Sequence, residues 1–304
     1  MAVVQDPSVQ RRRLRTELRK AREAAGLKQG EVAKAMDWSP SKLIRIEGGQ
    51  VSISTNDLRA LLTHYNVKDS RRTTSLLELA KSSRGSSFYD QYASALKPGF
   101  RDYLAYEGVA SVIRQYDPLL VPGLLQTEEF ARAILAYAGG LDADGIEQGW
   151  TVRQHRQEAV HDRDDPPELT FVIDEAAVRR HVGRSDRTMV RQLEQLKDYA
   201  SRPYITIRVL PFVSGAHPGM LGNFILLEFS ESDLADLVHL ESVDDITIKD
   251  DGDLIARYLD RFETLERLSL SPEDSVVFLD KVIAEMNAEG GGPIRTEEGR
   301  RAAV

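Results

Sequence analysis

Apolar residues recur at intervals of three and four along the first eighty positions, the spacing that places them on one face of an α-helix. The pattern predicts helices over about 11–25, 29–36, 39–47, 54–65 and 69–81. A run of small and polar residues at 82–87 (SSRGSS) follows the last helix and is typical of a linker. We therefore expect a helical domain over 10–82, preceded by a disordered segment at 1–9.

The second and third of these helices are separated by a tight turn. Ala33 is small enough for the third helix to cross closely over the second, and Ser39 followed by Pro40 is a favourable helix start. Asp37 stands in the turn where a glycine is usual, and Asp is one of the few other residues that tolerate the left-handed conformation. The pattern predicts a helix-turn-helix; the alternative is two amphipathic helices packed within a larger bundle.

The third helix is expected to turn Leu43, Ile44 and Ile46 toward the core. Gly48 and Gly49 are expected to supply a positive-φ exit from it, because glycine adopts that conformation without steric cost. Together these residues define which side of the third helix faces the protein.

This part of the chain resembles the DNA-binding domain of the phage-repressor (XRE) family. The resemblance is carried by Gly26-Leu27-Lys28-Gln29, Glu31-Val32-Ala33, Ser39 to Ile46 and Glu47-Gly48-Gly49, about a quarter of the chain. It implies that the third helix enters the major groove with its N-terminal part at the base edges. By position in the motif, the residues that face the DNA are Ser39, Pro40, Ser41, Lys42 and Arg45.

Side-chain chemistry separates the roles of these residues. Arg45 is the best candidate for a bidentate contact to guanine, a type of contact worth ~1–3 kcal/mol of discrimination. Ser41 and Lys42 each suit either a base or a phosphate. Gln29 and the amide groups at the start of the second helix are expected to meet a backbone phosphate.

Charge is divided unevenly along the chain. Residues 1–72 hold 15 Lys and Arg against 8 Asp and Glu, whereas the whole chain has a formal net charge of −8. A basic head on an acidic body suits the docking of one end on the phosphates of DNA. Arg12 and Arg15 on the first helix are candidates for such phosphate contacts; the alternative for each is a solvated basic side chain.

Composition excludes several other classes of site. The chain has no cysteine, which rules out disulfides, thiolate metal sites and cysteine nucleophiles and suits a reducing cytoplasm. No apolar run approaches the ~20 residues of a membrane span, and the first residues lack the apolar core of a signal peptide. We therefore expect a cytoplasmic protein without a cofactor or metal ion.

The chain changes character from residue 88, where aromatic residues and then short branched runs become frequent. Helices are predicted over about 88–96, 99–110, 127–139, 144–161, 175–182, 185–201, 253–268 and 272–287. Strands are predicted at 169–174, 205–210, 223–229 and 237–241, with 111–116 as a further candidate. Residues 88–288 should form a mostly helical domain with a small sheet of about four strands. The chain as a whole is then α+β, with a disordered tail at 289–304.

This second part resembles the C-terminal domain of WhiJ-like actinobacterial regulators. The resemblance is carried by Leu104-Ala105-Tyr106-Glu107, the run at 121–127 (VPGLLQT), Arg153-Gln154, and Val209-Leu210-Pro211 through Gly222. It implies a transcriptional regulator that is often paired with a small acidic protein encoded alongside, in an antitoxin-like or developmental arrangement. It assigns no chemistry to this domain.

The sequence contains little that indicates an enzyme. It has no GxxxxGK[ST], HExxH or GxSxG motif and no GxGxxG after a strand. A catalytic site would need His217, in a loop rich in Gly and Pro, with Asp174 and Glu175; the alternatives are a surface histidine and helix-capping carboxylates. Tyr103, Tyr116 and His217 are candidates for a ligand or partner site, and for the tyrosines the alternative is a place in the core.

These patterns predict a sequence-specific, double-stranded-DNA-binding transcriptional regulator. One helix-turn-helix contacts only a few base pairs, so we expect a homodimer on a pseudo-palindromic operator, with half-sites about one turn (~34 Å) apart. The acidic body is expected to supply dimerisation and to receive a protein partner or a small effector. Two alternatives are an antitoxin-like protein that neutralises a small partner while repressing its own operon, and an enzyme with a DNA-binding head.

Overall fold

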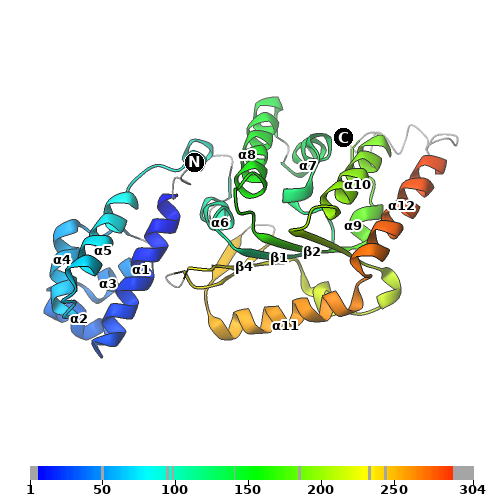
Figure 1. Ribbon diagram of the computed structural model, residues 1–304. Helices are drawn as coiled ribbons and strands as arrows, with labels where there is room; N and C mark the ends of the chain where they lie inside the picture. Colours follow the sequence, from blue (N-terminus) through cyan, green and yellow to red (C-terminus); the bar gives the residue numbers. More distant parts are fainter. Residues whose placement is uncertain are drawn as a thin grey trace. The chain divides into compact units, whose positions relative to one another are not determined.

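The computed structural model describes residues 6–48, 51–93, 96–97, 99–139, 141–183, 186–231, 234–242 and 245–289. The chain divides into two compact units, whose elements are drawn in Figure 1. The first unit contains the chain up to Gln91 together with Arg101–Tyr106 and Phe229–Ala235, and the second contains the remainder. Residues 1–5 and 290–304, which the sequence pattern predicts to be disordered, lie outside the described residues.

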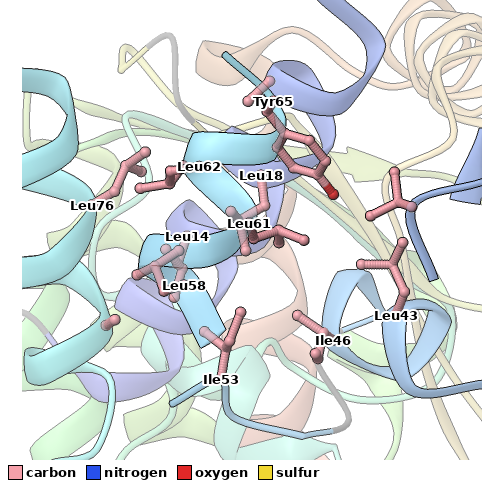
Figure 2. Close-up of a cluster of buried hydrophobic side chains, with 13 residues drawn as sticks. Leu14, Leu18, Leu43, Ile46, Ile53, Leu58, Leu61, Leu62, Tyr65 and Leu76 are labelled. Atoms are coloured by element: carbon pink, nitrogen blue, oxygen red, sulfur yellow. The ribbon is translucent and has the colours of Figure 1, made fainter. Parts of the chain in front are cut away.

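Five predicted helices form the N-terminal part of the first unit. Within the described residues up to Gln91 they are α1 (Pro7–Ala24), α2 (Gln29–Ala35), α3 (Pro40–Glu47), α4 (Thr55–His64) and α5 (Ser70–Ser82). Figure 2 shows the core in which their apolar side chains meet. Leu18, Leu43, Leu58 and Leu61 are almost fully buried in this core. Since burying one such side chain contributes roughly 1.5–3 kcal/mol, this core stabilises the packing of α3 against α1 and α2.

Helix α1 begins earlier than the sequence pattern predicts. Asp6 caps it by accepting a hydrogen bond from the backbone N–H of Ser8 (2.8 Å), and Pro7 occupies the first turn. Val9 is completely buried. The prediction of disorder is therefore wrong for residues 7–9, because Asp6 and Pro7 form a helix start ahead of the first apolar repeat.

Backbone conformations at three positions bear on the predicted helix ends. Gly26 (φ 71°) follows α1, and Asp37 (φ 54°) occupies the left-handed region between α2 and α3, as predicted. Gly48 is instead right-handed (φ −82°, ψ −5°), and its N–H donates to the carbonyl of Ile44 (2.8 Å). The predicted positive-φ exit is therefore wrong for Gly48, because this residue continues the helical turn; Gly49 lies outside the described residues.

A mixed sheet of six strands lies at the centre of the second unit, in the order β3-β2-β1-β4-β5-β6. The strands are β1 (Val112–Asp117), β2 (Glu168–Asp174), β3 (Ile205–Leu210), β4 (Phe224–Glu228), β5 (Leu237–Glu241) and β6 (Ile246–Lys249). Strands β1, β2 and β3 are parallel to one another, whereas β4 is antiparallel to β1. The carboxyl ends of β1 and β2 therefore lie side by side, next to the place where strand direction reverses.

Helices cover both faces of this sheet (Figure 1). One face packs on α11 (Gly252–Leu268) through a core that includes Tyr116, Val172, Phe224 and Phe262. Figure 1 shows α7, α8 and α10 on the opposite face. The remaining helices and 3₁₀ turns are α6 (Phe100–Glu107), α7 (Glu128–Gly139), α8 (Ala143–His161), α9 (Glu175–Arg179), α10 (Asp186–Ala200), α12 (Pro272–Glu289), η1 (Phe88–Tyr92), η2 (Gly123–Leu125), η3 (Phe212–Ser214) and η4 (Pro218–Leu221).

The predicted fold class, a helical head followed by an α+β body, is confirmed. The sheet has six strands among the described residues rather than about four. The candidate at 111–116 forms β1, and β6 was not predicted because only four residues of alternating pattern signal it. Within the segment predicted as a helix over 88–96, the described residues form the short turn η1, and residues 94–95 lie outside them.

Candidate nucleic-acid interface

A row of exposed residues runs along the side of α3 that faces away from the core. Ser41, Ile44, Arg45 and Gly48 are exposed, and their spacing of i, i+3, i+4 and i+7 places them on one helix face. We call these residues the outward face of α3. The helix therefore presents a hydroxyl, an aliphatic side chain and a guanidinium together.

Ile44 is the residue of α3 whose orientation the sequence pattern misplaces. Its side chain is 53% exposed, whereas Leu43 and Ile46 are buried. Successive helix residues point about 100° apart, so Ile44 points well away from the side that buries its two apolar neighbours. The prediction that it packs in the core is wrong.

A buried ion pair fixes α3 to α1. Arg22 Nε donates to Glu47 Oε1 (2.7 Å), and Arg22 Nη2 donates to Glu47 Oε2 (3.1 Å). Hydrogen bonding to Glu47 raises the pKa of Arg22. Gln29, predicted to contact a phosphate, donates from its side-chain amide to the same carboxylate (2.8 Å). Glu47 lies on the same helix face as the buried Leu43 and Ile46. A carboxylate on a core-facing side of a helix needs a charged partner, and this position in the sequence could have indicated the ion pair.

Two basic side chains near α3 are held by neighbours. Lys42 Nζ lies 4.0 Å from the centre of the Trp38 ring and 3.1 Å from Asp57 Oδ2. Arg15 Nη1 donates to the carbonyl oxygen of Gly48 (3.3 Å). Lys42 would therefore have to leave Asp57 before it could bind another anion.

The other predicted DNA-contacting residues of α3 are open to solvent. Ser39, Pro40, Ser41 and Arg45 are all exposed, and the hydroxyls of Ser39 and Ser41 lie 3.1 Å apart. Within the described part of the chain, Arg45 has no side-chain hydrogen-bond or ion-pair partner. Its guanidinium can therefore bind a ligand without first breaking a contact to another described residue.

Arg12 does not have the exposed position predicted for it. It is 1% exposed, and its guanidinium carbon lies 5.1 Å from the ring centre of Tyr106 and 5.5 Å from that of Phe229. Its Nη2 donates to the carbonyl oxygen of Ala235 (2.6 Å). The predicted phosphate contact of Arg12 is therefore corrected to a packing role inside the first unit, where cation–π attraction and this hydrogen bond hold it.

Buried polar residues of the second unit come together near the loop at 121–127. Arg156 donates to both carboxylate oxygens of Glu107 (2.6 and 2.7 Å). A Cβ added at Gly123 would lie 2.5 Å from Arg156 Nη1, so only glycine leaves room for the guanidinium. Arg153 Nη1 donates to Gln126 Oε1 (2.7 Å). Glu107, the VPGLLQT run and Arg153, which are far apart in the sequence, thus belong to one network.

Asp117 ends β1 on the side of the sheet away from α11. Gln115 Nε2 donates to its carboxyl group (2.5 Å). Burial raises the pKa of Asp117 to about 7, although the hydrogen bond from Gln115 and the charge of Arg156 act in the opposite direction. The side chain therefore changes its charge near neutral pH.

We expect Asp117→Asn to stabilise the chain at pH 8 more than at pH 5. The unfolded carboxyl titrates near 3.8 and the folded one near 7, so the folded state keeps a proton that the unfolded state loses. Stability therefore falls as pH rises through this window, and Asn escapes the loss. Burial lowers the pKa of His239 to about 3, so this residue makes the chain more stable as pH rises. To cancel that effect, the melting temperatures of the variant and the parent are compared at each pH. An equal difference at both pH values would contradict the assignment.

His217, Asp174 and Tyr116 lie together on the α11 side of the sheet. His217 Nε2 is 3.6 Å from Asp174 Oδ2, and the His217 ring stands edge-on to Tyr116 at a centroid distance of 6.1 Å. Asp174 Oδ1 accepts a hydrogen bond from the N–H of Ala176 (2.8 Å), the capping role that the sequence offered as its alternative. Among the described residues, the Tyr116 hydroxyl and His217 Nδ1 are buried without a hydrogen-bond partner.

The other two candidates of the second part do not join this group. Glu175 accepts hydrogen bonds from Arg179 Nε (2.6 Å) and from the N–H of Phe212 (2.8 Å). Tyr103 is 1% exposed and belongs to the first unit.

No group of three or more metal-ligating side chains was found in the described part of the chain. No helix there combines the length and apolar character that a membrane crossing requires.

Comparison with known families gives two matches, in separate parts of the chain. A family model described as a helix-turn-helix domain matches residues 13–74, and one described as a domain of unknown function (DUF5753) matches residues 100–281. No curated protein and no solved structure matches the chain. The DUF5753 match covers more than half of the 304 residues. The chain therefore belongs to the DUF5753 family and carries a DNA-binding helix-turn-helix domain ahead of that region.

Proposed function

We propose that the protein is a sequence-specific transcriptional regulator of the XRE type that reads double-stranded DNA with the outward face of α3. The observation that carries this proposal is the exposed guanidinium of Arg45 beside Ser41 on a helix fixed by a buried ion pair. A rigid helix with exposed hydrogen-bonding side chains is the element that a helix-turn-helix places in the major groove. A cytoplasmic location is part of the proposal.

A homodimer on a pseudo-palindromic operator is part of this proposal. The outward face of α3 is two helical turns long and can contact only a few base pairs. Specific binding at physiological salt therefore needs two copies of the helix, with half-sites about one turn (~34 Å) apart.

We assign the second unit to regulatory input rather than to catalysis. Glu175 accepts hydrogen bonds from Arg179 and from the backbone, so among the described residues it does not join His217 and Asp174. A protein partner is supported by four apolar side chains in the segment between β3 and β4. Their exposed fractions are 59% for Phe212, 90% for Val213, 69% for Met220 and 81% for Leu221. Contiguous exposed apolar patches mark interaction sites, and these four side chains of one segment are our candidates to form one.

An antitoxin-like function is the second candidate, and the same exposed segment supports it. In that case the partner is a small acidic protein encoded nearby, which the chain binds while repressing its own operon. Co-purification of such a protein with the native chain, lost when Val213 and Leu221 are changed to Ser, would favour this function. If the input is instead a small effector bound near Tyr116 and His217, its binding should be unaffected by the changes at Val213 and Leu221.

Arg45→Ala is expected to remove discrimination at one base pair of each half-site, worth ~1–3 kcal/mol. Arg59, an exposed arginine on α4, is the matched control because Arg59→Ala removes the same charge outside α3. That variant should change affinity for all sequences alike. Competition binding against duplexes altered one base pair at a time gives the comparison. If Arg45→Ala leaves the order of preferred duplexes unchanged, the proposed register of α3 is wrong.

A further inference from the structure

Ile44 is an exposed aliphatic side chain within the proposed DNA-contacting surface. Of the large apolar side chains described in residues 6–93, only Ile44 (53%) and Phe88 (37%) are classed as exposed. A single exposed apolar residue is common on protein surfaces and by itself indicates nothing. The position of Ile44 distinguishes it, because it lies on α3 between Ser41 and Arg45 on the outward face.

The fold does not require an apolar residue at position 44. Leu43 and Ile46 fill the core below α3, and Glu47 holds the helix to Arg22. Ile44 is branched at Cβ, so its χ1 angle is nearly fixed within a helix and its Cγ2 methyl group keeps one direction.

The chemistry of Ile44 limits what it can recognise in DNA. It has no donor or acceptor, so it cannot contact the hydrogen-bonding groups of the base edges or a phosphate. The apolar feature of the major groove is the methyl group on C5 of thymine. A cytosine methylated at C5 presents the same group in the same place.

We propose that Ile44 recognises a C5-methyl group on a pyrimidine, thymine or 5-methylcytosine, close to the base pair contacted by Arg45. This inference rests on the proposed function, since it assumes that α3 lies in the major groove. It makes binding dependent on one methyl group per half-site, and at a cytosine it makes binding dependent on methylation.

The test uses full-length protein and a duplex obtained by selection from random DNA. Each thymine is replaced in turn by deoxyuridine, which removes the methyl group and keeps every hydrogen-bonding group. With the parent protein we expect one such replacement in a half-site to weaken binding about fourfold, the effect of removing one buried methyl group from the interface. Ile44→Ala should bind the thymine and deoxyuridine duplexes equally, whereas Ile44→Val and Phe88→Ala should keep the preference. Melting temperatures establish that the variants fold.

A second arm separates the two sources of the methyl group. The same pair is changed to one containing cytosine or 5-methylcytosine, and the methylated duplex should bind the parent protein better by a similar factor. The inference is overturned if no deoxyuridine replacement weakens binding while Arg45→Ala still alters sequence preference, a result that leaves the proposed function intact. It is also overturned if Ile44→Ala keeps the preference for thymine. Failure to select any preferred sequence would overturn the proposed function and the inference with it.

Discussion

Arg22→Met is expected to destabilise the first unit by about 3–5 kcal/mol, because it leaves a buried carboxylate without its charged partner. Glu47 is 2% exposed, and the single hydrogen bond from Gln29 does not replace a bidentate guanidinium. The chain has two tryptophans, Trp38 in the first unit and Trp150 in the second. Urea unfolding followed by Trp38 fluorescence in a Trp150→Phe background therefore measures the free energy of unfolding of this unit.

A more exposed ion pair of the same chemistry is the control for this prediction. Arg72 Nη2 lies 2.9 Å from Glu17, and the side chains are 41% and 20% exposed. Arg72→Met should cost less than about 1 kcal/mol, since solvent screens such pairs. Combining Arg22→Met with Glu47→Leu should recover much of the loss, because no buried charge then remains. Equal effects of Arg22→Met and Arg72→Met would contradict the structural role assigned to Glu47.

The second large effect is expected for Arg156→Met in the second unit. Glu107 is fully buried, and this change removes both hydrogen bonds that Arg156 donates to it. A loss of about 3–5 kcal/mol should appear in urea unfolding followed by Trp150 fluorescence in a Trp38→Phe background.

Arg191 supplies the matched control for Arg156. It pairs with Glu129, and both side chains are about half exposed (56% and 48%). Arg191→Met should therefore shift the unfolding free energy by less than about 1 kcal/mol. If Arg156→Met is equally mild, the network around the loop at 121–127 does not hold the second unit together.

The helix-turn-helix was predictable because its signals are local. Asp37 is an example: Asp tolerates positive φ, and it occupies the position in the turn that adopts positive φ. Ile44 shows where local pattern is insufficient. Three apolar residues among four positions fit more than one helix face, and only the packing of Leu43 and Ile46 decides which is outward.

Long-range partners account for most of what could not be predicted. Arg12 was expected to be exposed because it lies off the predicted apolar face of the first helix, but Tyr106 and Ala235, distant in the chain, enclose it. The pair of Arg156 with Glu107 spans 49 positions and leaves no periodic signal. In the same way, sequence alone could nominate His217 and Asp174 but could not show that they lie 3.6 Å apart.

The central claim is that α3 reads base sequence, and selection of bound fragments from random duplex DNA tests it most directly. Full-length parent protein and Arg45→Ala would be compared at two salt concentrations. We predict that the parent selects a palindromic motif with a guanine in each half-site, that Arg45→Ala loses the preference for that guanine, and that both bind more weakly at higher salt. Binding without sequence preference, or an identical motif from both proteins, would contradict the claim.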